Sequence, residues 1–171
     1  VDEVDRVEPP FLQLVMERVW NEEQDRGSSV LRASTLAELG GAASVVREHL
    51  ARALGVLDPK EQEAAARMFE HLVTPSGTKI AHRATDLAEF ARLRPAAAVP
   101  VLNALGRERI LRPLDETDGD RYEIFHDVLA DAILDWRRTR DTELERAAAG
   151  RRQRRLAAIA GAALVALVVM T

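Results

Sequence analysis

The sequence predicts a mainly α-helical protein: a helical domain, then a winged helix-turn-helix with a small β-hairpin, then the start of a transmembrane helix. Three observations predict this order. The 171 residues are 47% hydrophobic and 4% aromatic, and they are rich in Ala, Leu, Arg and Glu, which are good helix formers. Apolar residues recur at helical spacing through most of the chain, whereas short strand patterns begin after residue 78. A charge-free apolar run fills residues 156–170.

We expect the chain to be part of a longer protein and to divide into five segments. Residues 1–8 are the tail of an upstream domain, residues 9–74 a helical linker domain, and residues 75–149 a winged-helix domain with a long C-terminal helix. A basic juxtamembrane stretch follows at residues 150–155, and a truncated transmembrane helix at residues 156–171.

Helix starts within the helical domain follow from residues that cap orphan backbone amides. Asp58 has Pro59 after it and Glu61 three residues on, which predicts a helix start with a capping box. Thr35 and Glu38 have the same spacing, so we also expect a short helix capped by Thr35.

The next segment has the element order of a winged helix-turn-helix. We predict a short strand at residues 79–82, followed by helices at residues 85–94 and 97–107. A two-stranded hairpin at residues 109–125 and a long helix at residues 126–149 complete the segment. An acidic turn with Gly119 joins the two hairpin strands.

The apolar run at residues 156–170 follows a cluster of basic side chains: Arg151, Arg152, Arg154 and Arg155. Such a cluster marks the cytoplasmic side of a membrane-spanning helix. We therefore expect these arginines to flank a membrane, with a cytoplasmic body anchored to the inner membrane. The alternative is a buried core helix.

Charge distribution argues against nucleic acid as the main partner. The net charge is −4, and all 28 acidic residues precede the arginine cluster, so the body is more acidic still. The expected recognition helix, residues 96–105, offers Asn103 but no cation to read bases. A membrane-anchored, DNA-binding transcriptional regulator remains the alternative, and it requires a basic face.

Motifs for catalysis are absent from the sequence. No GxxxxGK[ST] and no GxGxxG occurs, so the chain cannot hydrolyse nucleotide through a P-loop of its own. Without cysteine, thiolate metal sites and cysteine nucleophiles are excluded. We therefore expect no enzymatic activity in the chain itself.

The histidines are His49, His71, His82 and His126. We expect structural roles for His49 and His71, which have apolar neighbours on predicted helices, and leave His82 open. A helical phosphohydrolase with a metal at His126 and Asp127 is a further alternative, but HxxxH and HExxH spacings are missing. His126 lies where a strand ends and a helix begins, where anions are favoured; the plainer interpretation is a junction residue beside a first-turn carboxylate.

Four segments resemble bacterial STAND NTPases, the signal-transduction ATPases with numerous domains. They are residues 8–20 (EPPFLQLVMERVW), 72–82 (LVTPSGTKIAH), 109–112 (RILR) and 122–131 (YEIFHDVLAD), the last being the most specific. The resemblance implies a helical and winged-helix region between an upstream P-loop NTPase domain and downstream sensor repeats, commonly a WD-repeat propeller. It also implies ATP or ADP with Mg for the parent protein, and no cofactor in this region.

Phe125, His126 and Asp127 further resemble the Met-His-Asp motif of related immune and apoptotic switches. In those proteins the His touches the β-phosphate of ADP and holds the inactive state. The resemblance implies that His126 senses the nucleotide, and that Asp127 orients His126 or holds the local backbone. The expected function is regulatory: coupling the ADP or ATP state of the upstream domain to the sensor.

Overall fold

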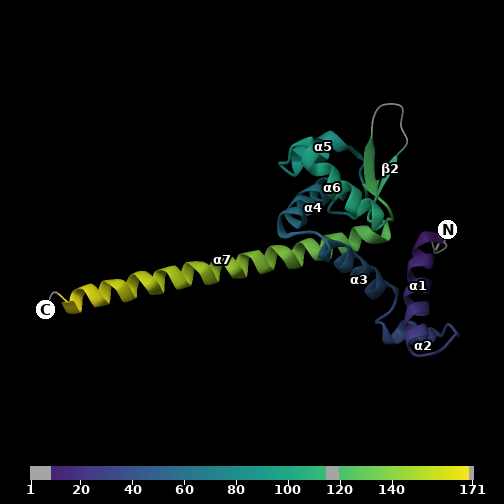
Figure 1. Ribbon diagram of the computed structural model, residues 1–171, viewed down its shortest axis with the longest axis horizontal. Helices are drawn as coiled ribbons and strands as arrows, with labels where there is room; N and C mark the ends of the chain where they lie inside the picture. The colour runs from purple at the N-terminus through teal and green to yellow at the C-terminus, as the bar shows by residue number, and fades with distance from the viewer. Residues whose placement is uncertain (1–8, 115–119, 170–171) are drawn as a thin grey trace. The chain divides into compact units, whose positions relative to one another are not determined.

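The computed structural model describes residues 9–114 and 120–169, which fall into two compact units divided between Trp136 and Arg137. The described chain is mainly helical with one small sheet (Figure 1). Its elements are α1 (Pro9–Asp25), α2 (Ala33–Glu38), α3 (Ala42–Gly55), α4 (Pro59–Leu72), β1 (His82–Arg83), α5 (Ala84–Phe90), α6 (Pro95–Arg107), β2 (Leu111–Leu114), β3 (Arg121–Ile124) and α7 (Val128–Val169). The predicted tail at residues 1–8 lies outside the described residues, as does most of the acidic turn.

The start of α4 confirms the predicted capping box. Asp58 Oδ1 accepts hydrogen bonds from the backbone N–H groups of Lys60 and Glu61, at 2.7 and 2.9 Å. The Glu61 carboxylate accepts one from the Asp58 N–H at 2.9 Å. Pro59 takes the first helical position, where its missing N–H costs nothing.

The start of α2 differs from the prediction that Thr35 caps it. Arg32 is the N-cap residue, and Thr35 lies inside the helix, buried. Its hydroxyl donates to the buried carboxylate of Glu23 on α1, which also pairs with Arg32. The hydroxyl therefore serves a tertiary contact between α1 and α2, because a buried carboxylate needs hydrogen-bond donors more than the helix end needs a cap.

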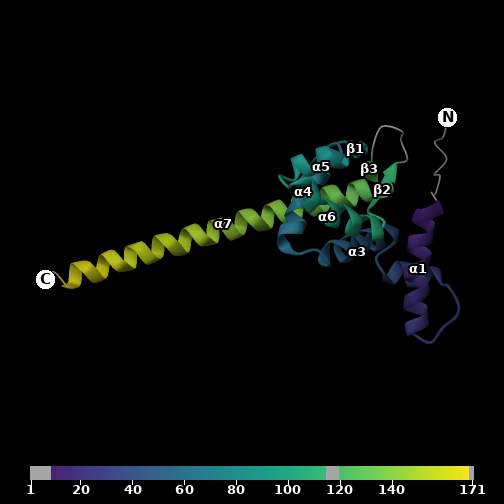
Figure 2. The same cartoon turned by 45° about the horizontal axis from the view of Figure 1, so that its top comes forward.

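The sheet has three antiparallel strands in the order β1-β3-β2. His82 pairs with Tyr122 across β1 and β3, and Leu111 pairs with Ile124 across β2 and β3. Figure 2 shows the strands beside α6, which contacts β2. Strand, two helices and hairpin thus follow one another as the sequence patterns indicate.

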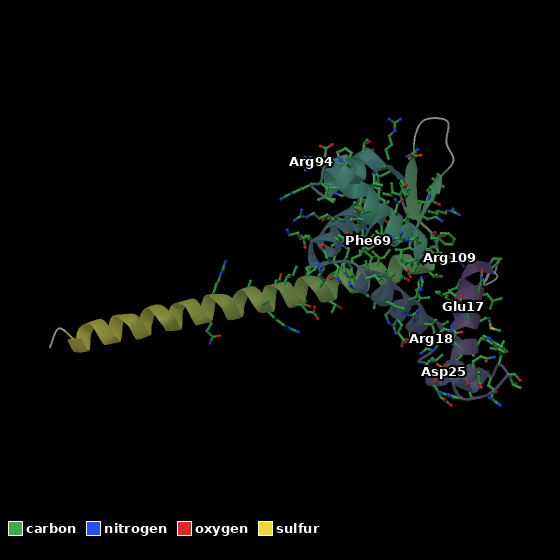
Figure 3. All side chains as sticks on the ribbon, viewed as in Figure 1. Glu17, Arg18, Asp25, Phe69, Arg94 and Arg109 are labelled. Atoms are coloured by element: carbon green, nitrogen blue, oxygen red, sulfur yellow. The ribbon has the colours of Figure 1, made fainter. Side chains whose placement is uncertain are left out.

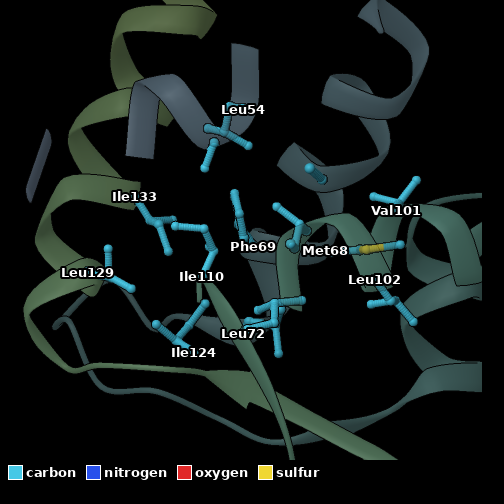
Figure 4. Close-up of a cluster of buried hydrophobic side chains, with 14 of the residues drawn as sticks. Leu54, Met68, Phe69, Leu72, Val101, Leu102, Ile110, Ile124, Leu129 and Ile133 are labelled. Atoms are coloured by element: carbon cyan, nitrogen blue, oxygen red, sulfur yellow. The ribbon is translucent and has the colours of Figure 1, made fainter. Parts of the chain in front are cut away.

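One hydrophobic core joins α3–α6, the sheet and the first turns of α7. Figure 4 shows Phe69 of α4 among side chains from several of these elements, and its exposure is 0%. Trp136 closes one side, with its ring edge-on to Phe69 at 6.0 Å between centroids. The predicted domain boundary at residue 74 stays a prediction.

The predicted transmembrane helix at residues 156–171 is wrong. α7 runs unbroken through the arginines Arg151, Arg152, Arg154 and Arg155 to Val169, and no helix among residues 9–114 and 120–169 is long and apolar enough to cross a bilayer. The membrane-flanking role of the arginines and the anchoring to the inner membrane were predicted from that span, and this finding gives them no support.

Candidate functional site

His126 lies at the corner between β3 and α7, as its place in the sequence indicates. The Phe125 N–H donates to the Ile110 carbonyl at 2.9 Å, which continues the pairing with β2 by one residue. The carbonyls of His126 and Asp127 then accept the first N–H groups of the helix, from Leu129 and Ala130. The His126 side chain is buried at 9% exposure, so it packs inside the first unit.

Asp127, in contrast, is exposed and forms an ion pair with Lys79 at 3.0 Å. The Lys79 ammonium also lies 3.7 Å from Glu123 of β3, and Glu123 accepts a hydrogen bond from Arg112 Nε at 2.7 Å. This small network ties the segment before β1 to the corner.

The inner side of the corner faces a cavity of about 290 Å³. Its walls come from α1, α3, the turn between α6 and β2, and the corner itself. The charged or titratable residues in the walls are Glu17, Arg18, His49, Arg52, Arg107, Glu108, Arg109 and His126. Figure 3 labels Glu17 and Arg18 on α1 and Arg109 beside them.

The arginines of the cavity differ in how they are neutralised. Arg18 is bound to Glu22 at 3.0 Å and lies 3.7 Å from Glu48. Arg52, Arg107 and Arg109 are exposed, and none of the three forms an ion pair with a carboxylate within the part of the chain that the structure describes. The cavity is therefore cationic, since Glu17 and Glu108 are outnumbered.

His49 has a fixed partner in the cavity wall. Its Nε2–H donates to the Glu108 carbonyl at 2.9 Å, which joins α3 to the end of α6. Burial lowers the pKa of His49, and the nearby charge of Arg52 lowers it further, against the hydrogen bond and the acidic neighbours. The neutral ring thus bridges two helices and lines the cavity.

Two further histidines lie elsewhere, around Phe90. The His71 ring stacks on Phe90 at 3.7 Å, and His82 Nε2 lies 3.1 Å from the His71 carbonyl. Among the described residues, no group of three or more His, Asp or Glu side chains is arranged to hold a metal ion. The phosphohydrolase alternative therefore lacks a ligand set there.

The sequence pointed to His126 and Asp127, but it missed the arginines that share the cavity. Arg52 and Arg107 belong to no local motif, and all three arginines share the cavity with His126 because the core packs α3 and α6 against the corner. Arg109 did stand within the RILR segment that carried part of the family resemblance.

The geometry defines the first unit as a mainly helical module. It has a three-stranded sheet and a cationic cavity at a strand-to-helix corner. The model of the family described as Novel STAND NTPase 1 matches residues 4–162, and the chain belongs to that family. No curated protein and no solved structure matches it.

Proposed function

We propose that this chain is the regulatory region of a STAND signalling NTPase, and that it couples the nucleotide state of a P-loop domain to downstream sensor repeats. Family membership supports the presence of an NTPase domain as partner. Because the chain has no P-loop motif, ATP hydrolysis with Mg belongs to that partner domain. A WD-repeat propeller is the sensor that the family resemblance favours.

The segment from β1 to β3 supports the interpretation as a winged helix. The order β1-α5-α6-β2-β3, with the sheet order β1-β3-β2, is the arrangement in which a hairpin forms a wing beside two helices. Most exposed residues of α6 are apolar, among them Ala96, Ala97, Val99 and Pro100, and only Asn103 and Arg107 could bind bases. This module therefore serves protein or nucleotide contacts.

The observation that carries the proposal is the position of His126 in the cationic cavity. A buried imidazole held at a rigid corner can donate a hydrogen bond to a phosphate oxygen. The hydrogen bond breaks when the corner moves away from the phosphate. A contact made in one state alone biases the equilibrium toward that state. His126 thus favours an inactive, ADP-bound state by contacting the β-phosphate.

Asp127 has a supporting role in this proposal. Its ion pair with Lys79 links the corner to the segment before β1, so the backbone that carries His126 is held from both sides. The pair is exposed and its contribution to stability is small, about 0–1 kcal/mol. Its effect is on where the imidazole lies.

The test is the rate at which ADP dissociates from a polypeptide that carries both the NTPase domain and this chain. A hydrogen bond to a charged group contributes about 1.5–3 kcal/mol, so His126→Ala should release a fluorescent ADP analogue about 10- to 100-fold faster. His71→Ala, which alters an exposed histidine outside the cavity, is the matched control. Equal ADP dissociation from the parent and H126A proteins would exclude the proposed role.

A further inference from the structure

A stripe of apolar side chains is exposed along α1. Leu12, Met16 and Trp20 recur at every fourth residue, so they share one face of the helix, and each is at least 38% exposed. Their neighbours Val15 and Val19 are buried, so the fold of this chain covers one side of α1 and leaves the stripe open. Large apolar side chains gathered at a surface mark a site for another protein, because their exposure to water is unfavourable.

Part of this stripe lines a groove of about 530 Å³. Met16 and Trp20 line the groove from α1, and Leu31 lines it from the segment between α1 and α2. The remaining lining residues are Gln13, Glu17 and Arg109. We call this surface, the groove together with Leu12, the α1 groove.

The exposed part of α1 carries little charge, although 30% of the residues in the chain are charged. Within residues 12–24, all of them described, Glu17 is the one exposed charged residue. Arg18 and Glu22 are partly buried and bind each other at 3.0 Å, and Glu23 is buried. A charge-poor face that presents Trp and Met beside an Arg has the composition of the centre of a protein–protein interface. The composition therefore favours a protein as the occupant of the α1 groove.

Glu17 and Arg109 indicate which protein the α1 groove takes. Both line it, and neither forms an ion pair within residues 9–114 and 120–169. The groove thus presents one charge of each sign. In two copies related by a two-fold axis, placing Glu17 opposite Arg109 of the second copy also places Arg109 opposite Glu17 of the second copy. The α1 groove is therefore complementary to itself.

We infer that the α1 groove is a self-association surface, through which two copies of this chain form a dimer. The apolar stripe lies at the centre of the interface, and two Glu17–Arg109 ion pairs between the copies lie at its edge. Closed two-fold dimers are the commonest assemblies of identical chains. Because the stripe is small, the dimer is weak, with an expected dissociation constant of about 1–100 µM.

The first test measures the dissociation constant of the full chain by sedimentation equilibrium. Leu12→Gln should weaken the dimer at least about tenfold, because the apolar contact is lost from both copies. Leu144→Gln is the matched control: Leu144 is 48% exposed against 49% for Leu12, but it lies on α7 and does not line the groove. This control should leave the dissociation constant unchanged. It also separates dimerisation through α1 from association through α7.

The second test exchanges the charges at the edge of the interface. Glu17→Arg and Arg109→Glu should each weaken the dimer about three- to tenfold, because each places like charges opposite one another. The double variant E17R/R109E restores opposite charges in both pairs and should recover most of the parent affinity. Apolar adhesion without a defined register would not give this recovery. Circular dichroism melting checks that every variant folds.

Three results would overturn the inference: a parent chain that stays monomeric at about 1 mM, an equal loss in L12Q and L144Q, or no recovery in the double charge variant. If the chain alone is monomeric and L12Q instead loosens its contact with an attached NTPase domain, that domain is the occupant and self-association is wrong. His126 does not line the groove, so His126→Ala should dimerise like the parent. The outcome is therefore independent of the proposed nucleotide sensing.

Discussion

Histidine and glutamate side chains in this protein are assigned their roles by neighbours that are distant in sequence. His49 and His126 share one cavity, yet His49 is held by a backbone carbonyl of Glu108. Glu23 is a buried acid whose donors come from the next helix. In both cases the fold shifts the pKa of the side chain: burial lowers the pKa of His49, and the hydrogen bond from Thr35 lowers the pKa of Glu23.

His49 should make stability depend on pH just below neutrality. Its pKa in the folded chain is lowered from the ordinary 6.5, chiefly by burial. The unfolded chain therefore binds the proton more readily, and the free energy of unfolding should fall as pH decreases from 7 through 6.5 and below. His49→Gln keeps a donor for the Glu108 carbonyl and cannot titrate. Denaturant unfolding at pH 7 and 5.5 should show a smaller difference for H49Q than for the parent.

Glu23 should also make the free energy of unfolding depend on pH. It should do so at lower pH than His49, and its ionised form is negatively charged whereas that of His49 is positively charged. The hydrogen bond from Thr35 lowers the pKa of Glu23 below 4.5, against the effect of burial. Its contribution is present above that ordinary value and is lost as pH falls below it, because the unfolded chain then binds the proton more readily. Glu23→Gln should lower the denaturant midpoint at pH 7 and differ less from the parent at pH 4. A constant difference across this range would contradict the assignment.

At the scale of elements, local signals predicted helix starts that depend on local contacts and failed where a distant partner intervened. The α4 capping box is made by residues three apart, so the sequence contains all of it. The Thr35 hydroxyl is taken by Glu23, twelve residues away, and no local rule includes that pair. The arginines of the cavity were missed for the same reason: α3 and α6 meet through the core.

The end of α7 shows a different failure. Residues 150–155 were interpreted as a basic juxtamembrane stretch between a long helix and a membrane span, but Arg and Ala are good helix formers, and the helix continues through them. A basic cluster before an apolar run has the same sequence pattern whether or not a membrane is present. The basic cluster alone therefore does not predict a membrane span.

Arg92 and Arg109 follow α5 and α6 with φ values of +56° and +54°, in the left-handed region, and glycine at either position should stabilise the fold. A left-handed L-residue costs roughly 1–2 kcal/mol, and the greater freedom of glycine in the unfolded chain offsets about 0.5–1 kcal/mol of that gain. Arg92→Gly should therefore raise the free energy of unfolding by up to about 1 kcal/mol, measured by urea denaturation. Arg92→Ala, which keeps the strain, should give no gain; a gain in R92A equal to that in R92G would show that strain is not the cause.

At the scale of the whole molecule, one core connects the elements that carry the candidate site. Phe69 of α4 contacts Trp136, and residues of α3, α6 and the corner belong to the same core. The cavity therefore exists only in the folded first unit. The element order and His126 could therefore be predicted from local patterns, whereas the arginines of the cavity could not, because the core as a whole brings them to His126.

The first turns of α7 should be required for the fold, and the rest of the helix should not. Ile133 is fully buried and Trp136 packs on Phe69, and loss of each such side chain costs about 2–5 kcal/mol. That sum is comparable to the total stability of a domain, about 5–15 kcal/mol. A chain cut after Asp131 should be largely unfolded at 37 °C, whereas one cut after Glu145 should melt within a few degrees of the parent, as followed by calorimetry. Similar melting of both would mean that the core does not depend on α7, and the rigid corner proposed to hold His126 would lose its support.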